Sequence, residues 1–176
     1  MTVGMEYICF ETVSGKQTRA FGTYLADFMA AGDFVALEGD MGAGKTCLTQ
    51  GLAEGLGYGG QVTSPTFMLL HLYEGGRLSL YHFDAYRLAS PSELEGLGYE
   101  EYFYGDAVCV MEWSELVEAY LPERRICVKL EKVTGTSDQA DTTANERRRI
   151  TVTLCGADER WADVTEKMRI YADSGD

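Results

Sequence analysis

The residues best suited to chemistry lie between positions 39 and 46, where the chain reads GDMGAGKT. Gly39, Gly44, Lys45 and Thr46 match the pattern G-x-x-x-x-G-K-[ST], in which backbone N–H groups surround a phosphate. In such a loop the lysine places a positive charge on the outer phosphates, and the threonine hydroxyl binds Mg²⁺. The segment expected to contact a nucleoside triphosphate comprises Gly39, Asp40, Met41, Gly42, Ala43, Gly44, Lys45, Thr46 and Cys47.

The segments on either side of this loop fit a strand and a helix. Residues 34–37 form a short apolar run, which is typical of a buried strand. After Thr46, the residues Leu48, Leu52 and Leu56 recur at helical spacing. A helix that begins here points the positive end of its dipole at the phosphate. This order favours nucleotide binding over the alternative of a glycine-rich turn with a surface lysine.

Two further groups of polar residues follow apolar runs. Glu112 comes directly after residues 108–111, and an acid at the end of the strand beside a phosphate-loop strand holds Mg²⁺ in many NTPases. We favour this role over that of a surface carboxylate. His82, Asp84 and Arg87 lie together in the segment HFDAYR. Strand ends near a phosphate loop are where catalytic residues gather, although a structural salt-bridge cluster would have the same composition.

The segment VTSPTF, residues 62–67, is a rigid turn that carries the hydroxyl groups of Ser64 and Thr66. Loops in this place often sense the outer phosphate of the nucleotide. A simple turn into the next strand is the equally weighted alternative. Beyond it, alternating apolar residues on both sides of a Glu-Gly-Gly-Arg turn at 74–77 predict an antiparallel β-hairpin.

The rest of the chain fits one α/β domain spanning residues 1–176. We expect a helix from about Lys16 to Gly32, paired strands at 126–130 and 150–154, and a polar loop at 134–145. The tail at 157–176 is predicted to form a short helix after Trp161. The fold class expected is a P-loop NTPase with a mixed, mostly parallel central sheet, flanking helices and an antiparallel hairpin.

Composition narrows the classes of function. The chain has 176 residues, 45% of them hydrophobic, and a net charge of −13, which argues against direct DNA or strong RNA binding. The basic triplet at 147–149 fits a solvated strand start better than a nucleic-acid contact. Five cysteines without a C-x-x-C pair read as reduced core residues of a cytosolic protein. No apolar run approaches a membrane span, so we expect a soluble cytoplasmic protein.

Together these segments resemble one family, the TsaE (YjeE) ATPases of bacterial tRNA threonylcarbamoyladenosine biosynthesis. The matching segments are GDMGAGKT at 39–46, VTSPTF at 62–67, LYHFDAYRL at 80–88 and VMEW at 110–113, and the resemblance runs from about residue 12 to 156. It implies an ATPase that serves formation of the threonylcarbamoyl group on adenosine 37 of tRNAs reading ANN codons. Its implied partners are the threonylcarbamoyl transferase enzyme and a paralogous subunit, which ATP hydrolysis resets between turnovers, with tRNA contacted only indirectly.

The resemblance also implies roles for single residues. Thr46 and Glu112 would hold Mg²⁺, and Asp84 matches an acid near the metal. The implied catalytic residues are Lys45, Asp84 and Glu112, and the implied nucleotide contacts beyond the loop are Thr12, Ser64, Thr66, Trp113 and Arg148. Ser114, in place of a usual proline, and Cys47, in place of a usual hydroxyl residue, depart from the family pattern, as does the long polar insertion at 134–145.

The expected reaction is in-line attack of water on the γ-phosphate of ATP, with ADP as product. Lys45, the loop amides and Mg²⁺ would stabilise the developing charge. Asp84 is the candidate to orient the water. No arginine in the sequence stands out as an internal finger, so we expect slow turnover alone and stimulation by partners. The alternatives are a small-molecule kinase and a nucleotide-dependent scaffold that does not hydrolyse ATP.

Overall fold

A seven-stranded sheet runs through the protein in the computed structural model, which describes residues 7–134 and 146–175. The strand order is β1-β7-β6-β2-β5-β4-β3. The central strands β6, β2, β5 and β4 are parallel to one another, while β7 pairs antiparallel with β6 and β1, and β3 pairs antiparallel with β4. The strands are β1 (Tyr7–Thr12), β2 (Phe34–Glu38), β3 (Leu70–Tyr73), β4 (Leu80–Asp84), β5 (Val108–Glu112), β6 (Arg125–Lys132) and β7 (Arg148–Cys155).

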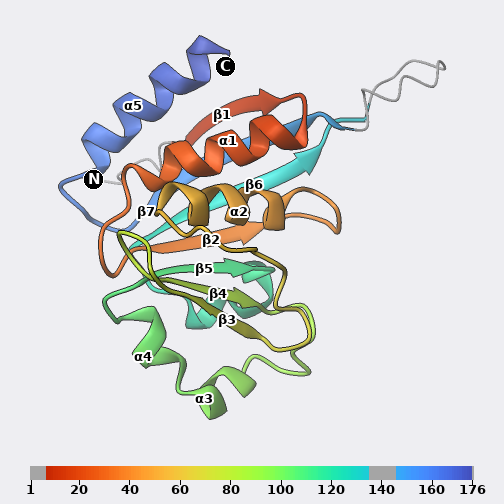
Figure 1. The fold of residues 1–176 in the computed structure, drawn as a ribbon, viewed down its shortest axis with the longest axis vertical. Coiled ribbons are helices and arrows are strands. Elements are labelled where there is room, and N and C mark those ends of the chain that lie inside the picture. Colours follow the sequence, from red (N-terminus) through yellow and green to blue (C-terminus); the bar gives the residue numbers. More distant parts are fainter. Residues whose placement is uncertain (1–6, 135–145, 176) are drawn as a thin grey trace.

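Helices cover both faces of the sheet, which creates two apolar cores (Figure 1). One face packs against α1 (Gly15–Ala26), α2 (Lys45–Gly55) and α5 (Trp161–Ser174), and the other against α3 (Glu93–Leu97), α4 (Tyr99–Phe103) and the 3₁₀ segment η1 (Ser114–Tyr120). Strand β2 is buried on both sides, since Val35 and Leu37 enter the first core while Phe34 and Ala36 enter the second. A strand covered in this way must be apolar throughout, as this one is.

The predicted fold class is confirmed, with its mostly parallel sheet, flanking helices and the hairpin β3–β4. Strands β6 and β7 also pair as expected. Among the described residues, no helix is both long enough and apolar enough to cross a bilayer. The polar insertion at 134–145 falls, apart from Thr134, outside the described residues.

Three expectations were wrong in detail. Helix α1 ends at Ala26 rather than near Gly32, because Met29 reaches the core from a turn and so continues the apolar pattern beyond the helix. The helix after Trp161 has 14 residues and is the longest described, not a short one. Of the five cysteines only Cys109 is buried, and Cys9 is exposed because no described helix covers the outer face of β1.

Local sequence explains where α1 begins and how it meets α2. The Ser14 side chain accepts a hydrogen bond from the backbone N–H of Gln17, and the Gln17 side chain accepts one from the N–H of Val13, one residue before the N-cap, so the pair is similar to a capping box. Glycines then allow α1 and α2 to approach closely. A Cβ on Gly22 would lie 2.9 Å from Leu52 N, and one on Gly51 would overlap the carbonyl of Arg19. This close crossing holds α2 against α1.

A network of ion pairs joins the starts of β2 and β6 at the edge of the sheet opposite the carboxyl ends of these strands. Asp33 is almost fully buried and accepts bonds from Arg124 and Arg160, 2.8 and 2.7 Å long. Asp158 accepts bonds from the same two arginines. The hydrogen bonds from Arg160 hold the pKa of Asp158 at about 2, below its ordinary value of 3.8. Asp158 therefore stays charged, and stabilising, well into the acid range.

We expect this network to govern acid stability. A carboxylate with a lowered folded-state pKa contributes stability above pH 3.8 that is lost as the pH falls through 3.8 towards 2. Asp158→Asn should remove that contribution, about 1 kcal/mol after solvent screening, and flatten the stability profile over the same window. Urea unfolding between pH 2 and pH 7 measures it. Asp163→Asn on the exposed face of α5 is the matched control, and equal profiles for the two variants would refute the assignment.

Candidate nucleotide site

The carboxyl ends of β2, β4 and β5 meet at one edge of the sheet and surround a cleft of about 370 Å³. The parallel pairing aligns Glu112 with Leu37 on β2 and with Asp84 on β4, so β4 and β5 each deliver a carboxylate to the same place beside the end of β2. The cleft is lined by Met41, Gly42, Ala43, Gly44, Lys45, Thr46, Cys47, Ser64, Thr66, Asp84, Tyr86, Arg87, Glu112 and Trp113.

The glycine loop between β2 and α2 forms one wall of the cleft. Gly44 has φ 106° and serves as the N-cap of α2, a backbone conformation that residues with a Cβ rarely adopt. As a glycine, Gly44 has no side chain with which to cap the first N–H groups of this helix. These groups, together with the helix dipole, form an environment suited to an anion. The local structure therefore fits a phosphate group at the start of α2.

Lys45 is the first residue of α2, and its ammonium group turns back onto the loop. Its Nζ donates to the carbonyl oxygens of Gly39 and Asp40, the second bond being 3.0 Å long. Burial lowers the pKa of Lys45 below its ordinary value of 10.5, with Glu112 the largest influence in the opposite direction. The Lys45 ammonium also lies 3.9 Å from the centre of the Trp113 ring.

Thr46 and Glu112 are in direct contact across the cleft. The Thr46 hydroxyl lies 2.9 Å from Glu112 Oε1 and 3.1 Å from Oε2. On its other side Glu112 Oε1 lies 2.8 Å from Nε2 of the fully buried His82. Because a carboxylate can only accept, Nε2 carries the proton in this contact. His82 Nδ1 has no partner among the described residues, so this one bond orients the ring and steadies Glu112.

Asp84 is the second carboxylate of the cleft and is tied to the Ser-Pro-Thr loop. Its Oδ2 accepts from the hydroxyls of Ser64 and Thr66, at 2.9 and 2.8 Å, and its Oδ1 accepts from the backbone N–H of Tyr86. Leu69, which ends this loop, has φ 67°, a strained backbone for a bulky residue. The loop position is thus linked directly to the charge of Asp84.

Trp113 closes the cleft beside Glu112. It has φ 58°, also a strained value for a bulky residue, and its ring packs against Tyr86 with centroids 4.9 Å apart. The next residue, Ser114, is buried and donates to the carbonyl of Leu37 at the end of β2. This bond, which a proline side chain could not form, braces the strand that carries the glycine loop.

A second hollow, of about 290 Å³, lies on the other side of the glycine loop and includes Gly15, Thr18, Cys47 and Arg148 in its lining. Arg148 donates to the carbonyls of Ala43 and Gly42, so this arginine supports the loop. Cys47 borders both hollows, its thiol lies 3.0 Å from Gly15 O, and burial raises its pKa.

The structure brings most of the predicted residues together. Residues 41–47 line the cleft with Ser64, Thr66, Asp84, Glu112 and Trp113. Gly39 and Asp40 lie behind it and bind Lys45, while Thr12 is buried against Thr18, behind the second hollow. The cleft residues that the sequence did not identify as contacts are Tyr86 and Arg87. Tyr86 and Arg87 lie two and three residues after Asp84, the last residue of β4, and this position alone was not a sufficient signal.

The residues present fit a magnesium-bound triphosphate. Thr46 and Glu112 supply hard oxygen donors side by side, and Mg²⁺ in phosphate sites takes one or two protein ligands besides phosphate and water. In the described part of the chain no group of three or more His, Cys, Asp or Glu side chains forms a separate metal site. The basic triplet is engaged within the protein, since Arg147 and Arg149 pair with Glu11 and Arg148 supports the glycine loop.

Comparisons with known proteins agree with this geometry. The model of the family described as "Threonylcarbamoyl adenosine biosynthesis protein TsaE" matches residues 12–141. The tRNA threonylcarbamoyladenosine biosynthesis protein TsaE of Bacillus subtilis is 40% identical over 152 residues, covering 86% of this chain and 89% of that protein. The Streptomyces coelicolor protein of the same name is 43% identical over 147 residues, covering 82% and 93%. A crystal structure of Bacillus subtilis YdiB matches with a TM-score of 0.76 and 34% identity, covering 95% of this chain and 97% of that one.

Proposed function

The chain belongs to the TsaE family of tRNA threonylcarbamoyladenosine biosynthesis, and from this premise we propose that it is a magnesium-dependent ATPase. It would act as a single-domain cytoplasmic accessory protein in forming the threonylcarbamoyl group on adenosine 37 of tRNAs reading ANN codons. The observation that carries the proposal is the contact between Thr46 and Glu112 at the start of α2. A hydroxyl and an acid in this arrangement are the two protein ligands that a phosphate-loop NTPase offers to its metal.

In the proposed reaction a water oxygen bonds to the γ-phosphorus of ATP as the bond to the β–γ bridging oxygen breaks. The bridging oxygen leaves with the electron pair on ADP, and the proton of the water passes to the departing phosphate. The N–H groups at the start of α2 and the Lys45 ammonium stabilise the charge on the phosphate oxygens. Mg²⁺, held by Thr46 and Glu112, would supply further neutralisation of that charge.

Asp84 is the residue proposed to orient the attacking water. Three donors, from Ser64, Thr66 and Tyr86, now occupy its two oxygens. Oδ2 accepts both hydroxyls, whereas Oδ1 accepts only the Tyr86 N–H and keeps a lone pair that could accept from a water. Because the Ser-Pro-Thr loop holds this carboxylate through Oδ2, a partner that shifts the loop would change how Asp84 meets the water, which supports slow turnover alone and acceleration by a partner.

The proposed partners are the threonylcarbamoyl transferase enzyme and its paralogous subunit, which hydrolysis would reset between turnovers. Multiple-turnover reconstitution tests this, by counting modified tRNA molecules per partner complex. Wild type should support many, and Glu112→Gln should stop the count near one, because the amide lacks the charge to hold Mg²⁺. Glu54→Gln, an exposed carboxylate on α2, is the matched control and should behave as wild type.

Two outcomes would overturn the proposal. If Glu112→Gln supported as many turnovers as wild type, the metal role of Glu112 would be wrong. If wild type supported many turnovers without releasing phosphate from ATP, the protein would be a nucleotide-dependent scaffold and not an ATPase. Phosphate release measured in the same reactions separates these results.

A further inference from the structure

Arg87 is the one arginine among the residues that line the main cleft. Its side chain is exposed and has no hydrogen bond or ion pair with any residue in the described ranges. By contrast, the other arginines with recorded bonds are tied to carboxylates or backbone carbonyls: Arg19, Arg77, Arg124, Arg125, Arg147, Arg148, Arg149 and Arg160. A guanidinium beside the phosphate site is therefore available for a ligand.

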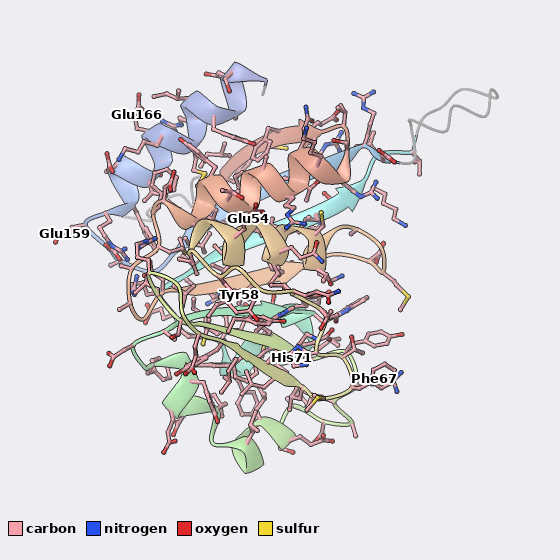
Figure 2. The ribbon with its side chains drawn as sticks, in the orientation of Figure 1. Glu54, Tyr58, Phe67, His71, Glu159 and Glu166 are labelled. Carbon is pink, nitrogen blue, oxygen red and sulfur yellow. The ribbon has the colours of Figure 1, made fainter. Side chains whose placement is uncertain are left out.

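The Arg87 side chain packs on the ring of Phe67, and the guanidinium carbon lies 4.1 Å from the ring centroid. Phe67 is 84% exposed and follows Thr66 directly, on the side of the molecule where the glycine loop lies (Figure 2). A cation–π contact at such an exposed site is worth only about 0.5–1 kcal/mol. Arg87 can leave Phe67 at little cost.

The negative charges of the carboxylates in the cleft and of a bound triphosphate would be balanced better by a second cationic side chain. Asp84 and Glu112 bring two carboxylates into the cleft, and Lys45 is the positive side chain that lines it besides Arg87. During phosphoryl transfer, negative charge on the γ-phosphate must be stabilised, and an arginine that does so is typically worth about 10³–10⁵-fold in rate. The planar guanidinium suits two phosphate oxygens at once.

We propose that Arg87 is an internal arginine finger. In the resting state its guanidinium packs on the ring of Phe67, and in the transition state it leaves the ring and contacts the γ-phosphate. The inference rests on the proposed ATPase function and names a catalytic residue for it. Phe67 shares a turn with Ser64 and Thr66, whose hydroxyls bind Asp84. A rearrangement at Asp84 therefore moves the ring on which Arg87 rests, so orienting the water and freeing the finger become one event.

Binding of ADP with Mg²⁺, alone and with tetrafluoroaluminate as a transition-state analogue, tests the proposal by calorimetry. Wild type should bind the ADP–fluoroaluminate complex more tightly than ADP. Arg87→Ala should keep the ADP affinity within about twofold, which shows that it is folded, but lose most of the additional affinity and about 10²–10³-fold in kcat. Arg87→Lys should recover only part of the additional affinity and of kcat, because an ammonium group cannot bind two phosphate oxygens in the way a planar guanidinium does. Arg149→Ala, an exposed arginine on β7, should match wild type.

Phe67→Ala gives a second readout that a purely structural Arg87 would not produce. Loss of the resting contact should raise the unstimulated rate by about two- to fivefold, the equivalent of one exposed cation–π contact. If wild type hydrolyses ATP and Arg87→Ala does so equally fast with the same affinity for the analogue, the finger is refuted while the ATPase function stands. If wild type binds neither ADP nor the analogue, the ATPase function fails and the finger with it.

Discussion

Lys45→Ala is expected to lower the rate of ATP hydrolysis by about 10²–10³-fold, the typical cost of removing one preorganised donor to a developing charge. Lys45 starts α2, and its buried ammonium is held by the carbonyls of Gly39 and Asp40, so it points along the glycine loop before any phosphate arrives. The methyl group of alanine leaves the triphosphate charge opposed by backbone N–H groups, the metal and the proposed finger Arg87.

Steady-state phosphate release in the presence of Mg²⁺ measures this effect. Lys167→Ala provides the control, because Lys167 is an exposed lysine of α5 that pairs with Asp163 one turn away. A rate for Lys45→Ala within about threefold of that control would contradict the electrostatic role assigned to the loop lysine.

Gly51→Ala is expected to have the largest effect on stability, about 3 kcal/mol or more of unfolding free energy. The added Cβ would lie 2.8 Å from the carbonyl carbon of Arg19 and overlap its oxygen. Backbone cannot rotate away as a side chain can, so α1 and α2 must separate. Separation would open the core around Leu48 and Leu52 and shift the first turn of α2.

Chemical unfolding with urea gives the free energy, and Gly96→Ala is the matched control. Gly96 also lies in a helix, α3, but no atom lies within 4 Å of the position its Cβ would take. Alanine there should be neutral or slightly stabilising. Equal unfolding free energies for the two variants would show that the helix crossing tolerates a wider spacing than the structure indicates.

The core of the fold was predictable because its signals are local. The phosphate-loop motif requires a strand before it and a helix after it. Residues 108–111 are too apolar for an edge strand, which indicated that Glu112 ends a buried strand beside β2. Their parallel pairing then places the acid of one strand beside the loop of the other. These constraints act through backbone geometry, which sequence patterns report well.

The rest depends on tertiary contacts that no spacing encodes. Arg87 lines the cleft because the chain turns after Asp84 and because Phe67 comes from another loop to meet it. Thr12, expected near the nucleotide, is instead shielded by Thr18, to which its hydroxyl bonds at 2.8 Å. Whether Thr12 or Thr18 faces the second hollow depends on how β1 packs against α1, which the sequence pattern does not encode.

The ion-pair network around Asp33 has a consequence for how the protein can be altered. It fastens β2 and β6 where they begin, whereas the glycine loop and Glu112 occupy the places where β2 and β5 finish. Resistance to unfolding and the proposed catalysis therefore depend on opposite ends of the sheet. We expect substitutions in the ion-pair network to change thermal stability and leave the proposed reaction unchanged. A variant that loses stability first is therefore expected to be altered near the start of the strands, and one that loses activity first near their carboxyl ends.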